Sequence, residues 1–146
     1  MADEIYDGIY VGDIQDAINW NKGDNIITVL TLNFKYLSMF TPEEAKLLER
    51  KYHYVKVIDN NFTHFNQDAL DKVVKIVLKL KTQNNNPILI HCYSGIERSP
   101  FTVAWVLFRL GYIKDFYEAY NLVKQKHPQT QDRTHWITPR MRKIIG

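Results

Sequence analysis

The sequence predicts an α/β fold: a single three-layer domain over residues 1–146, with a central, largely parallel sheet flanked by helices. Two observations support this prediction. Short runs rich in β-branched residues alternate along the chain with longer segments in which apolar residues recur at helical spacing. No internal repeat, low-complexity segment or linker interrupts this alternation, and 146 residues are enough to bury one hydrophobic core.

Four strands are expected from runs of apolar and β-branched residues. Residues 25–32, NIITVLTL, form the longest of these runs, and its polar borders indicate a buried strand. Residues 88–90, ILI, predict a second buried strand that leads directly into the part of the chain with the single cysteine. The two other expected strands are 8–12 and 52–58.

Six helical segments are expected between and after these strands. Thr41 can cap a helix that begins at Pro42, because Glu44 completes a capping box and proline suits the first helical position. Leucine and valine at helical spacing predict a helix over 66–81. The other expected segments are 13–20, capped by Asp13, and 100–110, 114–126 and 139–145.

Composition limits the classes of protein that this chain can belong to. The apolar fraction is 45%, and the formal net charge of +3 tolerates an anionic substrate without indicating a nucleic-acid binder. One cysteine excludes an internal disulfide framework, so a reducing compartment is expected. The opening MADEIYDGIY lacks the pattern of a secretory signal, and no apolar run approaches the roughly 20 residues of a membrane span. We therefore expect a cytoplasmic protein without membrane association.

The single cysteine lies in the stretch HCYSGIERSP, residues 91–100. Loop amides and the start of the following helix can converge there on one point, which is an arrangement that binds phosphate. Gly95 permits the turn, and the guanidinium of Arg98 can hold two phosphate oxygens. This positive field should favour the thiolate of Cys92, an in-line nucleophile toward a bound phosphate. The expected phosphate-binding residues are Tyr93, Ser94, Gly95, Ile96, Glu97 and Arg98.

The spacing of His91, Cys92, Arg98 and Ser99 resembles the signature of the cysteine-dependent protein tyrosine phosphatases. Most of the remaining chain is similar to their small dual-specificity subgroup, so the resemblance implies a dual-specificity phosphatase-like fold. The stretches that carry this similarity are GIYVGDIQDA, NIITVLTL, YVKVIDNNFTHF and GYIKDFYEAYNLVKQKHP, and they occur in the family's order.

The resemblance implies a role for each matching residue. Cys92 would attack phosphorus and form a phosphocysteine, while Arg98 would bind the phosphate and stabilise the transition state. Ser99 would donate a hydrogen bond to the departing thiolate, and His91 would tune the thiol and brace the loop. Asp59, 33 positions before Cys92, would be the general acid and later the base. The scheme needs no cofactor or metal, and the five histidines show no close ligand spacing.

Several of these residues have simpler interpretations. Cys92 could be a buried apolar residue, His91 a core histidine and Asp59 a turn residue. Ser99 could merely cap the following helix. Gln129–Gln131 resembles a water-positioning glutamine loop of classical tyrosine phosphatases, although an ordinary turn is favoured. Packing is favoured for Phe62, His64 and Phe65, and a solvated basic surface for Arg133, Arg140, Arg142 and Lys143.

Two residues depart from the family pattern. Glu97 stands where members often carry glycine or serine, and its carboxylate should weaken anion binding unless it turns away or pairs with a cation. Pro100 replaces a common small residue, which the start of a helix tolerates.

The predicted function is hydrolysis of phosphotyrosine in proteins, with phosphoserine and phosphothreonine as further substrates. RNA 5′-triphosphatase or phosphoinositide phosphatase activity is the enzymatic alternative, and Glu97 argues against both because it removes positive potential. A phosphate-binding module without catalysis is the remaining alternative, disfavoured because Cys92 and Asp59 are both present. Phosphorylated proteins are the expected partners, and an RNA 5′ end is a less favoured one.

Overall fold

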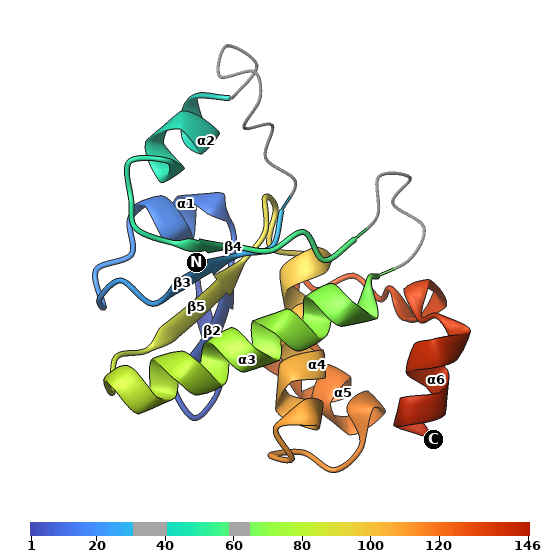
Figure 1. The fold of residues 1–146 in the computed structure, drawn as a ribbon. Helices are drawn as coiled ribbons and strands as arrows, with labels where there is room; N and C mark the ends of the chain where they lie inside the picture. The colour runs from blue at the N-terminus through green and yellow to red at the C-terminus, as the bar shows by residue number, and fades with distance from the viewer. Residues whose placement is uncertain (31–40, 59–64) are drawn as a thin grey trace.

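The computed structural model describes residues 1–30, 41–58 and 65–146, and it confirms the predicted α/β architecture. A five-stranded sheet has the order β1-β2-β5-β3-β4, in which β1 pairs antiparallel with β2 and the other pairs are parallel. Figure 1 shows helices on both sides of this sheet. The strands are β1 (Asp3–Tyr6), β2 (Ile9–Gly12), β3 (Ile26–Thr28), β4 (His53–Tyr54) and β5 (Ile88–His91).

The helices form the two outer layers. In Figure 1, α1 and α2 lie on one side of the sheet, and α3, α4 and α5 lie on the other. Among the described residues, no helix combines the length and hydropathy needed to cross a membrane. The helices are α1 (Ile14–Ile18), α2 (Pro42–Leu47), α3 (Gln67–Gln83), α4 (Arg98–Arg109), α5 (Phe116–Lys126) and α6 (Pro139–Ile145), with a 3₁₀ turn η2 (Thr134–Trp136).

Capping residues set where several helices begin, as the sequence predicts. The Thr41 side chain accepts a hydrogen bond from the Glu44 N–H, and the Glu44 side chain accepts one from the Thr41 N–H. Asp13 forms the same reciprocal box with Asp16 at α1. Each box satisfies amide groups that a helix leaves unpaired at its start.

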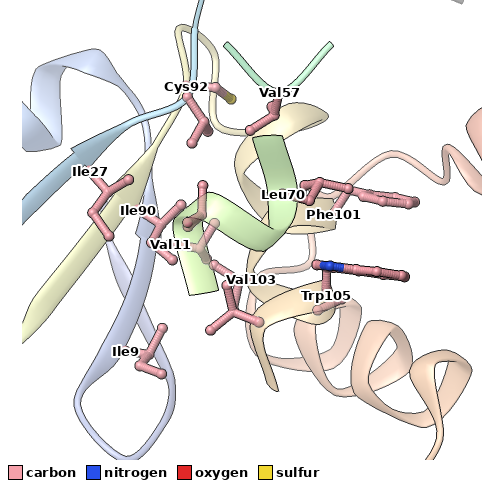
Figure 2. Close-up of a cluster of buried hydrophobic side chains, with 14 of the residues drawn as sticks. Ile9, Val11, Ile27, Val57, Leu70, Ile90, Cys92, Phe101, Val103 and Trp105 are labelled. Atoms are coloured by element: carbon pink, nitrogen blue, oxygen red, sulfur yellow. The ribbon is translucent and has the colours of Figure 1, made fainter. Parts of the chain in front are cut away.

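The central strands β3 and β5 are buried along their whole length, as expected for parallel strands covered on both faces. Their side chains pack with those of α4, where Phe101, Val103 and Trp105 are inaccessible to solvent. Figure 2 shows Cys92 at the edge of this cluster. The nucleophile candidate is thus packed against the hydrophobic core.

Some predicted boundaries were wrong. The strand β1 was not expected from the sequence, because Asp3 and Glu4 have low strand propensity and only Ile5 is buried. The two-residue turn at Asp7 and Gly8, with φ of 49° and 77°, pairs β1 with β2.

The other differences concern the lengths of elements. Sheet pairing ends at Thr28 in β3 and covers only His53–Tyr54 of the expected strand 52–58. The helix expected from 100 begins at Arg98, two residues earlier. The end of the expected strand 25–32, beyond residue 30, lies outside the described residues.

Candidate active site

The stretch 91–100 forms the loop between β5 and α4, beyond the carboxyl end of the sheet's central strand (Figure 1). Ligands of open α/β sheets bind at this end. Cys92 is buried at the start of the loop, and its Sγ accepts a hydrogen bond from the Gly95 N–H at 3.2 Å. The loop therefore directs a backbone donor at the sulfur, which stabilises negative charge there.

Three loop carbonyls are turned outward by hydrogen bonds from other parts of the chain. The Tyr93 oxygen accepts from Ile14 N at 3.1 Å, and the Ile96 oxygen accepts from Gln131 N at 2.8 Å. The Gly95 oxygen is 2.7 Å from His127 Nε2. Because a trans peptide is planar, the N–H that follows each carbonyl points the opposite way. The amides of Ser94, Ile96 and Glu97 therefore face the interior of the loop, as an anion cradle requires.

The first turn of α4 adds further positive potential. Glu97 is the N-cap residue but makes no side-chain cap hydrogen bond, so the first amides of α4 remain available to an anion. Arg98 is the first helical residue, and its guanidinium has no ion-pair partner among the described residues. Helix dipole, helix-start amides and a guanidinium thus coincide at one helix start.

His91 is both a buried histidine and a brace of the loop. Its Nε2 lies 2.7 Å from Thr28 Oγ1, and its Nδ1 lies 3.1 Å from the Cys92 carbonyl oxygen. Burial lowers the pKa of His91 to about 4, so the ring is neutral at physiological pH. Since a carbonyl only accepts, Nδ1 carries the proton and Nε2 accepts from the Thr28 hydroxyl.

Ser99 does not cap α4, because it is the second helical residue and is fully buried. Its Oγ donates to the Gly12 carbonyl at 3.0 Å and lies 3.2 Å from Cys92 Sγ. A hydroxyl has one hydrogen, so with Gly12 accepting it, the neutral thiol donates to Ser99. When the sulfur is ionised, rotation of the hydroxyl would direct that hydrogen to the thiolate. The geometry is therefore compatible with the role predicted for Ser99.

The carboxylate of Glu97 pairs with a cation. Its Oε1 accepts from Arg133 Nη2 at 2.8 Å, and both side chains are partly buried. Arg133 also donates to the Gln131 side chain, so this arginine is not part of the solvated basic surface predicted from the sequence. The loop at 129–131 contributes the Gln131 backbone donor to Ile96, which gives it a structural part in the cradle.

We expect Arg133→Ala to weaken the binding of orthovanadate roughly three- to tenfold, the effect of one unneutralised charge at a partly exposed site. The reason is that the Glu97 carboxylate would then repel the anion. Adding Glu97→Gln to Arg133→Ala should restore affinity, whereas Arg140→Ala, which breaks an exposed pair with Asp68, should not change it. Isothermal titration measures all four proteins. Failure of the double variant to recover would contradict the electrostatic explanation.

Gly95 is required by both conformation and space. Its φ is +74°, and a Cβ there would lie 3.0 Å from the Gly12 carbonyl carbon and 3.1 Å from Asp13 N. Backbone atoms cannot move aside cheaply, so a side chain would displace the loop from β2.

We expect Gly95→Ala to reduce the free energy of unfolding by more than the roughly 1–2 kcal/mol that a left-handed conformation costs. Gly111→Ala is the matched control, because Gly111 has φ +77° with no atom within 4 Å of its Cβ position. Urea denaturation and vanadate binding test both variants. Equal destabilisation by the two would show that contact with Gly12 is unimportant.

Asp59 lies outside the described residues, as do Phe62 and His64. The structure describes the residues on either side of 59–64. Ile58 and Phe65 form an antiparallel bridge, and Asn66 N donates to the Val57 oxygen at 2.7 Å. Phe65 is buried and stacks on Phe101 of α4 with 4.0 Å between ring centroids, which confirms packing for that residue.

Two side chains that hold the loop were not predicted from the sequence. Thr28 ends β3 and contacts His91, 63 positions away. His127, at the end of α5, is buried and contacts both Asp3 and Gly95. No local pattern signals either contact, because each depends on the sheet order and on where α5 ends. In the described part of the chain, no group of three or more His, Cys, Asp or Glu side chains could hold a metal ion.

The Cys92 sulfur is buried beneath inward-facing amides, and it lies between a central parallel strand and a helix that begins with arginine. This arrangement places the chain in the class of cysteine-dependent protein tyrosine phosphatases. Residues 9–141 match the family model "Dual specificity phosphatase, catalytic domain". The chain belongs to this family.

Individual relatives agree with this assignment. The chain is 28% identical over 141 residues to "Dual specificity protein phosphatase MPK-4" of Drosophila melanogaster, covering 93% of this chain but only 34% of that protein. It resembles the structure of Cydia pomonella PTP-2 phosphatase with a TM-score of 0.68 at 19% identity, covering 92% of this chain and 84% of the other. PTPMT1 in complex with PI(5)P gives a TM-score of 0.67 at 16% identity, covering 99% and 91%. The two structural likenesses show the fold alone.

Proposed function

We propose that this chain is a phosphatase that hydrolyses phosphotyrosine in proteins, with phosphoserine and phosphothreonine as further substrates, through a phosphocysteine intermediate. The observation that carries the proposal is the orientation of the loop. Carbonyls at Tyr93, Gly95 and Ile96 are held outward while the Gly95 amide contacts the Cys92 sulfur. A phosphate bound by the inward amides would stand in line with that sulfur.

The proposed reaction has two steps. The Cys92 thiolate forms a bond to phosphorus, and the bond from phosphorus to the substrate oxygen breaks while Asp59 gives that oxygen its proton. Water, deprotonated by the Asp59 carboxylate, then attacks phosphorus and displaces the sulfur, to which Ser99 donates a hydrogen bond. Arg98 and the loop amides stabilise the charge on the equatorial oxygens in both transition states.

Initial rates on four substrates test the proposal: a phosphotyrosine peptide, the matching phosphoserine peptide, a dispersed phosphoinositide and an RNA with a 5′-triphosphate. We expect the largest kcat/KM for the phosphotyrosine peptide. Faster turnover of the lipid or the RNA would replace the proposed substrate class. Vanadate binding without turnover of any substrate would indicate a phosphate-binding module.

A phosphoinositide is the second candidate substrate. The ion pair with Arg133 offsets the charge of Glu97, so the objection to more highly charged substrates that the sequence suggests is weaker in the folded protein. The likeness to PTPMT1 with PI(5)P concerns the fold and adds no contact to a headgroup here. Phosphotyrosine therefore remains the first candidate.

A further inference from the structure

His127 connects the phosphate-binding loop to the edge strand of the sheet. The residue is 1% exposed and ends α5. Its Nδ1 lies 2.6 Å from Asp3 Oδ2 in β1, and its Nε2 lies 2.7 Å from the Gly95 oxygen. Both distances are short for hydrogen bonds from nitrogen, as charge-assisted bonds are.

The two partners of His127 determine how many protons the ring carries. A carboxylate and a carbonyl oxygen both accept hydrogen bonds, whereas a neutral imidazole has one N–H to donate. Two donors are needed, so the ring is an imidazolium, or else Asp3 holds the second proton. An imidazolium bound to a carboxylate satisfies both contacts, and the 2.6 Å separation of Nδ1 from Asp3 Oδ2 is that of such an ion pair.

Several charged groups on the elements packed around His127 are engaged with other partners. Glu97 in the loop pairs with Arg133, and Lys124 of α5 pairs with Asp132. On β1, the Glu4 carboxylate accepts a hydrogen bond from Gly8 N. Within the part of the chain that the structure describes, Asp3 is the charged side chain that contacts the ring.

We propose that His127, held as an imidazolium by Asp3, is a positioning residue for the phosphate-binding loop. By donating to the Gly95 oxygen, it fixes the Gly95–Ile96 peptide so that the Ile96 N–H faces the bound phosphate. Backbone amides hold the carbonyls of Tyr93 and Ile96. Among the described contacts, the Gly95 carbonyl is instead held by a side chain, that of His127. The effect of His127 on catalysis rests on the proposed function, whereas its contacts with Asp3 and Gly95 do not.

Nuclear magnetic resonance of the wild-type protein tests the protonation state directly. With ¹⁵N-labelled histidine at neutral pH, we expect both ring nitrogens of His127 to show the shifts and couplings of an imidazolium, with Asp3→Asn converting the ring to a neutral form. The side-chain amide introduced by this substitution can donate to Nδ1, so Nε2–H would still donate to Gly95. A neutral ring in the wild-type protein would overturn the proposal.

Orthovanadate affinity tests the positioning role. We expect His127→Ala to weaken vanadate binding roughly tenfold, the loss of one hydrogen bond that involves a charge, while Asp3→Asn retains most of the affinity. His135→Gln, at an exposed histidine, is the control and should bind as the wild type does. Affinities are compared at a temperature where circular dichroism shows each variant folded. If His127→Ala is too unstable, Asp3→Asn, which keeps the donor, is compared with Asp3→Leu, which leaves the ring without its partner and should bind less tightly.

Wild-type vanadate affinity in folded His127→Ala, or equal affinity in the two Asp3 variants, would overturn the positioning role. The proposed function fails separately, through absence of turnover by the wild-type protein. Vanadate binding and the nuclear magnetic resonance signature do not depend on turnover, so the two failures are distinguishable.

Discussion

Cys92→Ser should abolish turnover of a phosphotyrosine peptide while leaving the peptide bound. The hydroxyl of serine is a far weaker nucleophile than a thiolate, and Cys92 is the only cysteine in the chain. The loop amides and Arg98 remain, because the carbonyl contacts that orient the loop do not involve the sulfur. We expect a loss of at least about 10⁴-fold in kcat, as is typical when a covalent nucleophile is removed.

Two measurements on this variant separate chemistry from binding. Steady-state rates give the loss of kcat, and fluorescence anisotropy with a labelled phosphopeptide gives the dissociation constant, which should change little. Rapid quenching of the wild-type reaction, followed by mass spectrometry, should show phosphate on the peptide that contains Cys92. Residual turnover at the wild-type rate in the serine variant would place the nucleophile elsewhere.

The sequence was sufficient to predict the parts of the fold that depend on local patterns. The start of β5 and the capping box at Thr41 came out as predicted, because β-branched runs and capping residues act over a few positions. β1 was missed because two acidic residues hide a strand whose stability comes from pairing with β2. The Asp7–Gly8 turn was the signal that could have revealed it.

The candidate site likewise has one part that local sequence predicts and another that depends on distant residues. The nucleophile, arginine and glycine lie within seven consecutive residues, so their spacing alone predicts a phosphate cradle. What holds the cradle in shape comes from distant segments: Ile14, His127 and Gln131 each bind one loop carbonyl. Those contacts follow from the packing of α1, α5 and the loop between α5 and η2. No spacing rule in the sequence predicts that packing.

Glu97 shows how a residue's effect depends on a partner that lies far along the chain. In the sequence, its carboxylate counts against anion binding. In the folded protein, the Arg133 guanidinium, 36 positions later, neutralises the Glu97 carboxylate. The pair also connects the loop between α5 and η2 to the start of α4. The pair therefore converts a locally unfavourable charge into a contact that supports the site.

Asp59→Asn should reduce kcat on phosphotyrosine by about 10²–10⁴-fold, the usual contribution of a general acid. The described residues on either side of position 59 support this role for Asp59. Ile58 pairs with Phe65, and Phe65 stacks on Phe101 in the first turns of α4, whose N-terminus forms part of the cradle. Phe65 thus connects the described chain that follows this position to the helix that carries Arg98, and Ile58 is joined to it by the bridge.

The loss should depend on the leaving group, which distinguishes an acid from a residue that merely supports the fold. A basic phenolate or alkoxide needs a proton as it departs, whereas an acidic nitrophenol does not. Across a series of aryl phosphates, we therefore expect Asp59→Asn to make kcat/KM much more sensitive to the acidity of the phenol than in the wild-type protein. Asp24→Asn, at an exposed aspartate that pairs with Arg50, should leave the series unchanged. Equal slopes for Asp59→Asn and the wild type would mean that the proton comes from another group, because a general loss of structure would lower all the rates together without changing their dependence on the phenol.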